Sequence, residues 1–182
     1  ELRHVIESSD MSVLLLSAGS DAHVNYASLL TEAFPLLETF SSVGQHLPTA
    51  PRLRRIVLFD SPPTNWSMSP TEFLELGNVV GESDVKWRSR GVAVRDTALM
   101  LYTSGTTGRP KGCVLSHRYE LAAGEAYATR GGLATFRATG ERLYNPLPLF
   151  HVNASILSFY AVLLTGSCQI QTDRFQPSRW WS

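Results

Sequence analysis

Short apolar runs recur along this chain, and helix-forming segments separate most of them. Residues 13–16, 55–59 and 98–102 each form a nearly unbroken apolar row. A strand buried on both faces of a sheet has this pattern, because neither face can carry polar side chains. Strands that alternate with helices fold into a sheet with helices packed on its faces. The sequence therefore predicts an α/β fold, with a mixed sheet flanked by helices.

Helix boundaries are marked by side chains that can cap a helix. Ser69 is followed three residues later by Glu72, with Pro70 in the first helical position, which is the pattern of a capping box. That helix is expected to stop near Gly77. A helix is expected to begin near residue 20 and to run through residue 30, with Pro35 as the residue that kinks or ends it, and another is expected at 118–130. Further short strands are expected at 113–115, 142–145 and 169–171.

Two other segments have a distinct character. Residues 81–96 are mostly polar and favour a loop. Residues 156–164 are apolar on every face of a helix, so they predict a fully buried helix that stops at Gly166. Pro177 gives the signal for a helix start close to the last residue, and the first residue is Glu1 rather than Met. We therefore expect the 182 residues to belong to something longer.

Composition excludes several classes of function. The 16 Lys and Arg residues balance the 16 Asp and Glu residues, so the chain lacks the basic surface expected of a nucleic-acid binder or an anionic-membrane binder. Two cysteines, Cys113 and Cys168, are too few for a disulfide scaffold or a cysteine-rich metal site, which favours a cytoplasmic location. The longest apolar stretch is about half of the roughly 20 residues that span a bilayer, so no transmembrane segment is predicted.

Residues 103–112 form the most informative segment, a loop that directly follows the run at 98–102. Its glycines allow backbone N–H groups to approach a ligand closely, its hydroxyl side chains add donors, and Lys111 adds one positive charge. These groups suit a chain of phosphates. The spacing is not that of a Walker A loop or a dinucleotide-binding fingerprint. On composition alone, a solvated turn is the alternative.

The order of these residues resembles a known family. The string Tyr102-Thr103-Ser104-Gly105-Thr106-Thr107-Gly108-Arg109-Pro110-Lys111-Gly112 is similar to the AMP-binding signature of the adenylate-forming superfamily. Acyl-CoA synthetases, firefly luciferase and the adenylation domains of nonribosomal peptide synthetases belong to it. The resemblance implies that this loop binds the phosphates of ATP, through Thr103, Ser104, Gly105, Thr106, Thr107, Gly108 and Lys111.

A second string points to the acyl-CoA synthetase branch of that superfamily. Residues 144–154, with Pro148-Leu149-Phe150-His151 at their centre, resemble a motif that borders the acyl pocket and the nucleotide. The resemblance implies a catalytic, gating role for His151 and acyl-pocket roles for Phe150, His151 and Asn153. Many relatives carry Gly two or three residues after the His, where this chain has Asn153 and Ala154. Residues 163–180 resemble acyl-CoA ligases, in particular the crotonobetaine/carnitine-CoA ligase-like group.

The resemblance implies a two-step reaction in the full-length protein, with ATP, Mg²⁺ and coenzyme A. A carboxylic acid, expected to be a fatty or other acyl acid, is first joined to AMP and then transferred to the thiol of coenzyme A. An adenylating enzyme that uses a carrier-protein thiol is one alternative. A non-catalytic nucleotide-binding piece is another. Nothing in the pattern specifies an oligomeric state.

Several parts of the family's machinery lie outside residues 1–182. The sequence has no Tyr-Gly-x-Thr-Glu motif, no later Asp for the ribose hydroxyls, and no C-terminal domain with its catalytic Lys. We therefore expect a partial N-terminal domain that forms no product on its own. No residue in it is predicted to bind a metal directly.

Overall fold

The computed structural model describes residues 1–17, 24–40, 45–103, 108–130, 135–137, 140–172 and 177–179. These residues form two compact units. The first unit contains Glu1–Gly91 and Tyr102–Gly112, and the second contains Val92–Leu101 and Cys113–Ser182. The boundary therefore crosses the segment around the phosphate loop, and each unit is described in turn.

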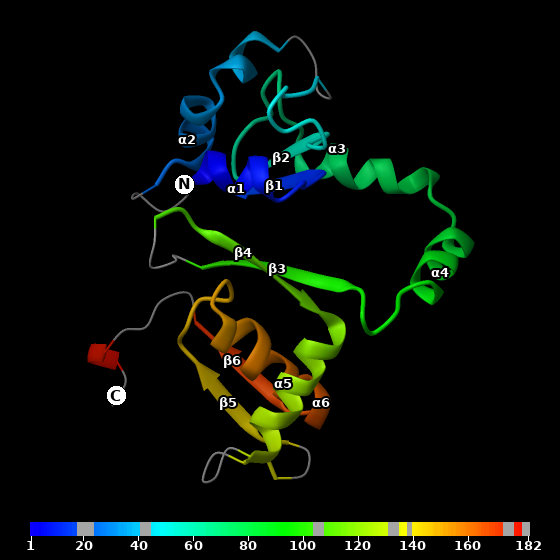
Figure 1. Ribbon diagram of the computed structural model, residues 1–182, viewed down its shortest axis with the longest axis vertical. Helices are drawn as coiled ribbons and strands as arrows, with labels where there is room; N and C mark the ends of the chain where they lie inside the picture. Colours follow the sequence, from blue (N-terminus) through cyan, green and yellow to red (C-terminus); the bar gives the residue numbers. More distant parts are fainter. Residues whose placement is uncertain are drawn as a thin grey trace. The chain divides into compact units, whose positions relative to one another are not determined.

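The first unit is built around a parallel strand pair (Figure 1). Val13 lies opposite Arg55 and Ser17 opposite Phe59, so the whole length of both strands is paired. A parallel pair needs a long crossover connection, which the helices between the two strands provide. In chain order the elements are α1 (Leu2–Ser8), β1 (Val13–Ser17), α2 (Tyr26–Ala33), the 3₁₀ helix η1 (Pro35–Thr39), β2 (Arg55–Phe59), α3 (Pro70–Glu75), the 3₁₀ helix η2 (Leu76–Val79) and α4 (Glu82–Arg90).

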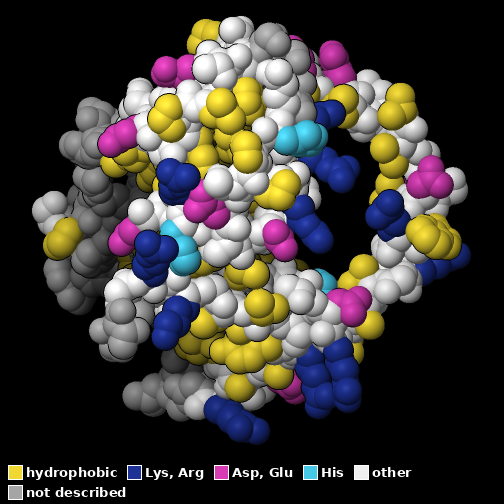
Figure 2. Space-filling model, turned by 45° about the horizontal axis from the view of Figure 1, so that its top comes forward, with side chains coloured by type: hydrophobic (Ala, Val, Ile, Leu, Met, Phe, Trp, Pro, Cys, Tyr) yellow, Lys and Arg dark blue, Asp and Glu magenta, His cyan; other side chains and the backbone are white. Residues whose placement is uncertain are grey.

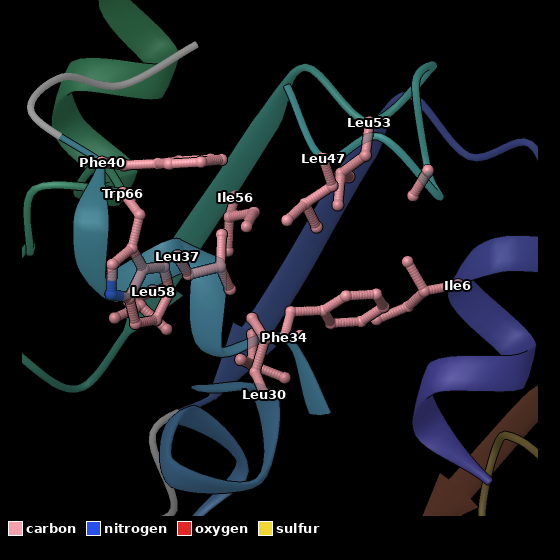
Figure 3. Packing of buried hydrophobic residues seen from close by; sticks show 12 residues of the cluster. Ile6, Leu30, Phe34, Leu37, Phe40, Leu47, Leu53, Ile56, Leu58 and Trp66 are labelled. Carbon is pink, nitrogen blue, oxygen red and sulfur yellow. The ribbon is translucent and has the colours of Figure 1, made fainter. Parts of the chain in front are cut away.

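A single apolar cluster fills the space between this strand pair and the helices (Figure 3). Phe34 at the end of α2 reaches toward Ile6 of α1, while Leu58 of β2 lies near Trp66. Burying one such side chain completely stabilises a fold by about 1.5–3 kcal/mol. The cluster therefore holds α1, α2 and β2 together; its buried members are Ile6, Leu16, Leu30, Phe34, Leu37, Phe40, Leu47, Ala50, Leu53, Ile56, Leu58 and Trp66.

The predicted capping box is confirmed. The hydroxyl of Ser69 accepts a hydrogen bond from the Glu72 N–H at 3.2 Å, and the Ser69 N–H donates to the Glu72 carboxylate at 2.7 Å. These bonds stabilise the ionised carboxylate, and the Ser69 N–H is the main reason that the pKa of Glu72 lies below its ordinary value. Pro70 takes the first helical position, as expected.

The predicted loop at 81–96 is wrong for most of its length, because residues 82–90 form helix α4. Acidic Glu82 lies in its first turn and basic Arg90 in its last, an arrangement that complements the helix dipole. Lys86 pairs with Glu82 one turn earlier at 2.6 Å. No residue of this helix is buried, so it lacks the apolar stripe that identifies a helix in sequence.

The second unit contains a second parallel pair, in which Arg142 lies opposite Cys168 and Asn145 opposite Gln171. Helices α5 and α6 pack side by side next to this pair (Figure 1). The strands β3 and β4 pair with each other, so the described strands form three two-stranded sheets rather than one. The remaining elements in chain order are β3 (Thr97–Thr103) and β4 (Lys111–Ser116), which each have residues in both units, then α5 (His117–Arg130), β5 (Arg142–Asn145), the π-helix η4 (Asn153–Ser158), α6 (Phe159–Thr165), β6 (Cys168–Gln171) and η5 (Pro177–Arg179).

The predicted apolar helix is confirmed, but its full burial is not. Residues 153–165 are helical and end at Gly166, whose φ of 64° suits glycine. Ile156 and Ala161 are fully buried, whereas Leu163 is 59% exposed. The helix packs on α5 along one face, and the opposite face carries exposed apolar side chains. Strand 98–102, also predicted to be buried, is half-buried.

Helices α5 and α6 approach very closely at Gly124. A Cβ atom placed on Gly124 would lie 2.4 Å from the Cβ of Tyr160 and 3.0 Å from the backbone nitrogen of Ala161. Only a residue without a side chain fits this crossing. Near it, the Tyr160 hydroxyl donates to the buried carboxylate of Glu120 at 2.7 Å, and this hydrogen bond raises the pKa of Tyr160.

Hydrophobic side chains also lie at the surface in several places (Figure 2). Leu74 and Val79 of the first unit are 73% and 89% exposed, and Phe150 of the second is 81% exposed. Scattered exposed apolar residues are normal in proteins, and these three lie in α3, in η2 and in the turn before η4.

Candidate functional site

The ends of the predicted phosphate loop are well defined. Thr103 is the last residue of β3, and Lys111 is the first residue of β4 and is exposed. Gly108 has a φ of +121°, a conformation that residues with a Cβ rarely adopt. The glycine at this position is therefore required by the backbone. The other predicted phosphate contacts, Ser104, Gly105, Thr106 and Thr107, lie outside the described residues.

Helix α1 contacts both ends of this loop. The Nε2 atom of His4 donates to the carbonyl oxygen of Pro110 at 2.9 Å, and the hydroxyls of Ser8 and Tyr102 are 2.7 Å apart. The sequence analysis did not identify His4 or Ser8. No local signal could have found them, because they precede their partners by 106 and 94 residues.

The second predicted motif follows the end of β5. Asn145 is buried at the last position of that strand, and its Oδ1 atom accepts a hydrogen bond from the Leu147 N–H at 2.9 Å. Gln171, at the end of β6, donates from Nε2 to the Leu147 carbonyl oxygen at 2.7 Å. We call these two bonds the Leu147 clamp. They fix the segment that leads directly to Phe150 and His151.

The structure brings Phe150, His151 and Asn153 into one turn of chain. The His151 N–H donates to the Pro148 carbonyl, and the Nδ1 atom of His151 accepts from the Asn153 N–H at 3.3 Å. A neutral His151 that accepts at Nδ1 carries its proton on Nε2. The Asn153 side chain accepts from the Ser158 hydroxyl at 3.4 Å across the π-helix η4. Single π-helical turns occur often at functional sites.

Asn145 and Gln171 were missed by the sequence analysis, although Asn145 lies within the second motif. A polar residue at the end of a strand is an ordinary turn signal, so its role is visible only once Leu147 is placed. The Nδ2 atom of Asn145 is buried and has no hydrogen-bond partner among the described residues. The hydrogen bond that Oδ1 accepts from the Leu147 N–H is therefore the interaction through which the Asn145 side chain supports this segment.

The second unit also has an open groove of about 750 Å³ along α5 and α6, lined by residues such as Leu121, Ala128 and Leu164. None of the residues predicted to bind nucleotide or acid lines it. In the part of the chain that is described, no three His, Cys, Asp or Glu side chains are arranged to hold a metal ion.

The α/β fold and the two motifs are those expected of an AMP-binding domain, and comparison with known proteins identifies the family. The family model for the AMP-binding enzyme matches residues 1–182. The chain therefore belongs to the AMP-binding enzyme family, the adenylate-forming family that the loop at 103–112 resembles.

Curated relatives include acyl-CoA ligases. The medium/long-chain-fatty-acid–CoA ligase FadD6 of Mycobacterium tuberculosis is 37% identical over 90 residues, which cover 50% of this chain and 15% of that protein. The long-chain-fatty-acid–CoA ligase FadD15 of the same organism is 30% identical over 164 residues, which cover 88% of this chain and 23% of that protein. The chain thus spans less than a quarter of the length of these relatives.

Comparison with a solved structure confirms the α/β fold. The ATP-bound MatB structure from Rhodopseudomonas palustris superposes with a TM-score of 0.54 at 19% identity, covering 98% of this chain and 29% of that chain. Among the described residues, no helix is both long and apolar enough to cross a membrane.

Proposed function

We propose that the intact protein to which these residues belong is an AMP-forming acyl-CoA ligase. A carboxylate is a poor electrophile because its leaving group would be oxide. Attack of the carboxylate oxygen on the α-phosphorus of ATP breaks the bond to pyrophosphate and gives an acyl-adenylate. The sulfur of coenzyme A then bonds to the acyl carbon, AMP leaves with the electron pair of the broken C–O bond, and the thiol proton is released.

The phosphate loop carries this proposal. Gly108 at a φ of +121°, followed by the exposed Lys111 at the start of β4, supports a loop that wraps a phosphate chain. Lys111 would stabilise the charge of the departing pyrophosphate, and the hydroxyl and N–H groups of residues 103–108 would donate to its oxygens. Most of the catalysis at such a loop is positioning and electrostatic stabilisation.

The segment held by the Leu147 clamp would form the acyl side of the site. Phe150 is an exposed aromatic ring beside His151, and both follow the motif of the acyl-CoA synthetase branch. His151 would present the proton on Nε2 to the nucleotide or to the acyl group, and Asn153 would lie beside it on the acyl side of the site. The relatives that are fatty-acid–CoA ligases support a fatty or other acyl acid as substrate.

Mg²⁺ would enter together with ATP. Because the described residues include no cluster of three metal-binding side chains, we assign no residue to it and derive no step from it. The free cysteines Cys113 and Cys168 are compatible with a cytoplasmic location, which stays part of the proposal.

The test is acid-dependent exchange of pyrophosphate into ATP, followed by thioester formation with coenzyme A, in the intact protein. The proposal predicts both reactions, and a loss of activity of about 100- to 1,000-fold in His151→Ala, the effect of removing one positioned catalytic group. Exchange that depends only on amino acids, or transfer only to a carrier-protein thiol, would contradict the acyl-CoA ligase proposal and would indicate another kind of adenylating enzyme. The 182 residues alone are expected to form no acyl-adenylate, since they span less than a quarter of the relatives.

A further inference from the structure

The phosphate loop is rich in glycine, the residue with the widest choice of backbone conformations. Residues 103–112 include three glycines, and Gly108 takes a conformation that only glycine adopts easily. Glycine loses more conformational freedom on ordering than any other residue. A binding loop gains precision when a rigid neighbour fixes its ends, because less conformational entropy is then lost when the ligand binds.

Helix α1 is that neighbour in the first unit. His4 and Ser8 are four residues apart, so they lie on the same face of the helix. His4 holds the carbonyl oxygen of Pro110 at the end of the loop, and Ser8 holds the hydroxyl of Tyr102 just before its start. One helical turn therefore fastens both arms of the loop.

The Ser8 hydroxyl donates to the His4 carbonyl oxygen at 2.6 Å and lies 2.7 Å from the Tyr102 hydroxyl, which also donates to the carbonyl oxygen of Val5 in the same helix at 3.4 Å. His4 must carry a proton on Nε2, because the Pro110 carbonyl can only accept. The rings of His4 and Tyr102 also meet edge to face, with centroids 6.5 Å apart. His4, Ser8 and Tyr102 thus form one connected group.

Helix α1 is itself anchored to the core. Ile6, between His4 and Ser8 in sequence, is 2% exposed and belongs to the apolar cluster (Figure 3). The guanidinium of Arg3 lies 5.7 Å from the centre of the Phe34 ring. The loop ends are thereby connected, through α1, to the apolar cluster of the first unit.

We infer that His4, Ser8 and Tyr102 are positioning residues for ATP. They fix the two ends of the phosphate loop, so that its N–H groups and Lys111 start from a set position when the triphosphate arrives. This inference rests on the proposed function, because it assigns the loop to ATP. None of the three side chains needs to contact the nucleotide.

The experiment uses the intact protein with His4→Leu and Tyr102→Phe, which remove one fastening each while keeping most of the side-chain volume. Each is expected to raise the KM and the Kd for ATP about threefold to tenfold, the effect of one lost hydrogen bond. The KM for the carboxylic acid should not change. His4→Gln, whose amide can still donate to Pro110, should recover most of the affinity for ATP.

A matched control lies on the same helix. Glu7 pairs with Arg3 at 2.9 Å and also interacts with Thr49. The substitution Glu7→Gln changes the charge near His4 without removing either hydrogen bond from His4 or Ser8 to the loop ends. Glu7→Gln should therefore leave the affinity for ATP unchanged, whatever it does to the unfolding temperature. The inference is overturned if His4→Leu and Tyr102→Phe lower only the unfolding temperature, or if Glu7→Gln weakens ATP binding as much as they do.

Direct calorimetry with ATP separates this result from the proposed function. If the wild-type protein binds ATP but shows no acid-dependent exchange, the ligase proposal fails, while the ATP affinities of the variants still decide the positioning role. A wild-type protein that does not bind ATP overturns both.

Discussion

The two segments that carry the candidate site residues are supported in opposite ways. The phosphate loop is fastened by His4 and Ser8, which lie 106 and 94 residues away from their partners in sequence. The segment before His151 is fastened by Asn145 and Gln171, which lie 2 and 24 residues from Leu147. The first support therefore depends on a folded core, and the second on the ends of one strand pair.

The two segments should therefore respond to the loss of packing in different parts of the fold. Loosening the apolar cluster of the first unit should reach the phosphate loop through α1. Loosening the α5–α6 packing of the second unit should leave the Leu147 clamp in place, because the clamp is made by β5 and β6.

Ile6→Ala should have the largest effect. Removing a fully buried branched side chain costs about 2–5 kcal/mol through lost burial and the cavity left behind. Since Ile6 anchors α1, the KM for ATP should rise together with the loss of stability, and the KM for the acid should not. Chemical denaturation and steady-state kinetics on the intact protein measure both, and an unchanged KM for ATP would separate α1 from the loop.

Gly124→Ala should destabilise the second unit by about 1–3 kcal/mol, because the new methyl group would overlap Tyr160 at 2.4 Å. The control is Gly77→Ala, where the added Cβ meets nothing within 4 Å. It should change the free energy of unfolding by less than about 0.5 kcal/mol. Equal effects of the two substitutions would contradict the close helix crossing.

Tyr160→Phe should cost about 1–2 kcal/mol at neutral pH, since it removes a hydrogen bond to the buried Glu120 carboxylate. The folded state raises the pKa of Tyr160, so its contribution is present below the unfolded pKa of about 10 and is lost as pH rises through the folded pKa. Denaturation curves measured from neutral to alkaline pH should therefore converge for the wild type and the variant. The KM for the acid should stay the same.

Asn145→Leu should have the smallest effect on stability, about 0.5–1.5 kcal/mol, because it removes one hydrogen bond together with an unpartnered donor. Its specific result is faster hydrogen exchange of the Leu147 amide and a higher KM for the acid. Asn145→Asp keeps the Oδ1 acceptor and should preserve the hydrogen bond from the Leu147 N–H.

The clamp is tested further by combining Asn145→Leu with Gln171→Met. Both side chains bond Leu147, so their effects on the KM for the acid should be less than additive. Strict additivity would mean that they act on independent parts of the fold.

The sequence was informative wherever a signal is local. The strands at 55–59 and 142–145 are found at their predicted residues, and the Ser69 capping box is complete, because these depend on neighbours a few positions apart. Helix α4 was missed because a helix without an apolar face resembles a polar loop. The burial of 156–164 was overestimated because a run of apolar residues does not reveal how many faces are covered.

In the candidate site too, local features could be predicted from the sequence and long-range contacts could not. The motifs at 103–112 and 148–151 are contiguous strings and could be recognised directly. The partners that fix them could not, because a histidine in α1 and a glutamine in β6 carry no mark of the carbonyl that each will bond. Long-range supports become visible only when the fold brings them together.

The most direct test of the central claim is acid-dependent pyrophosphate exchange in the intact protein, with Lys111→Ala compared with Lys86→Ala. Lys86 is an exposed lysine of α4 whose ammonium group pairs with Glu82 one turn earlier in the same helix. Loss of one charge-assisted phosphate contact should lower kcat/KM for ATP about 10- to 100-fold in Lys111→Ala, and Lys86→Ala should match the wild type. Equal activity of both variants, or no acid-dependent exchange in the wild type, would contradict the account.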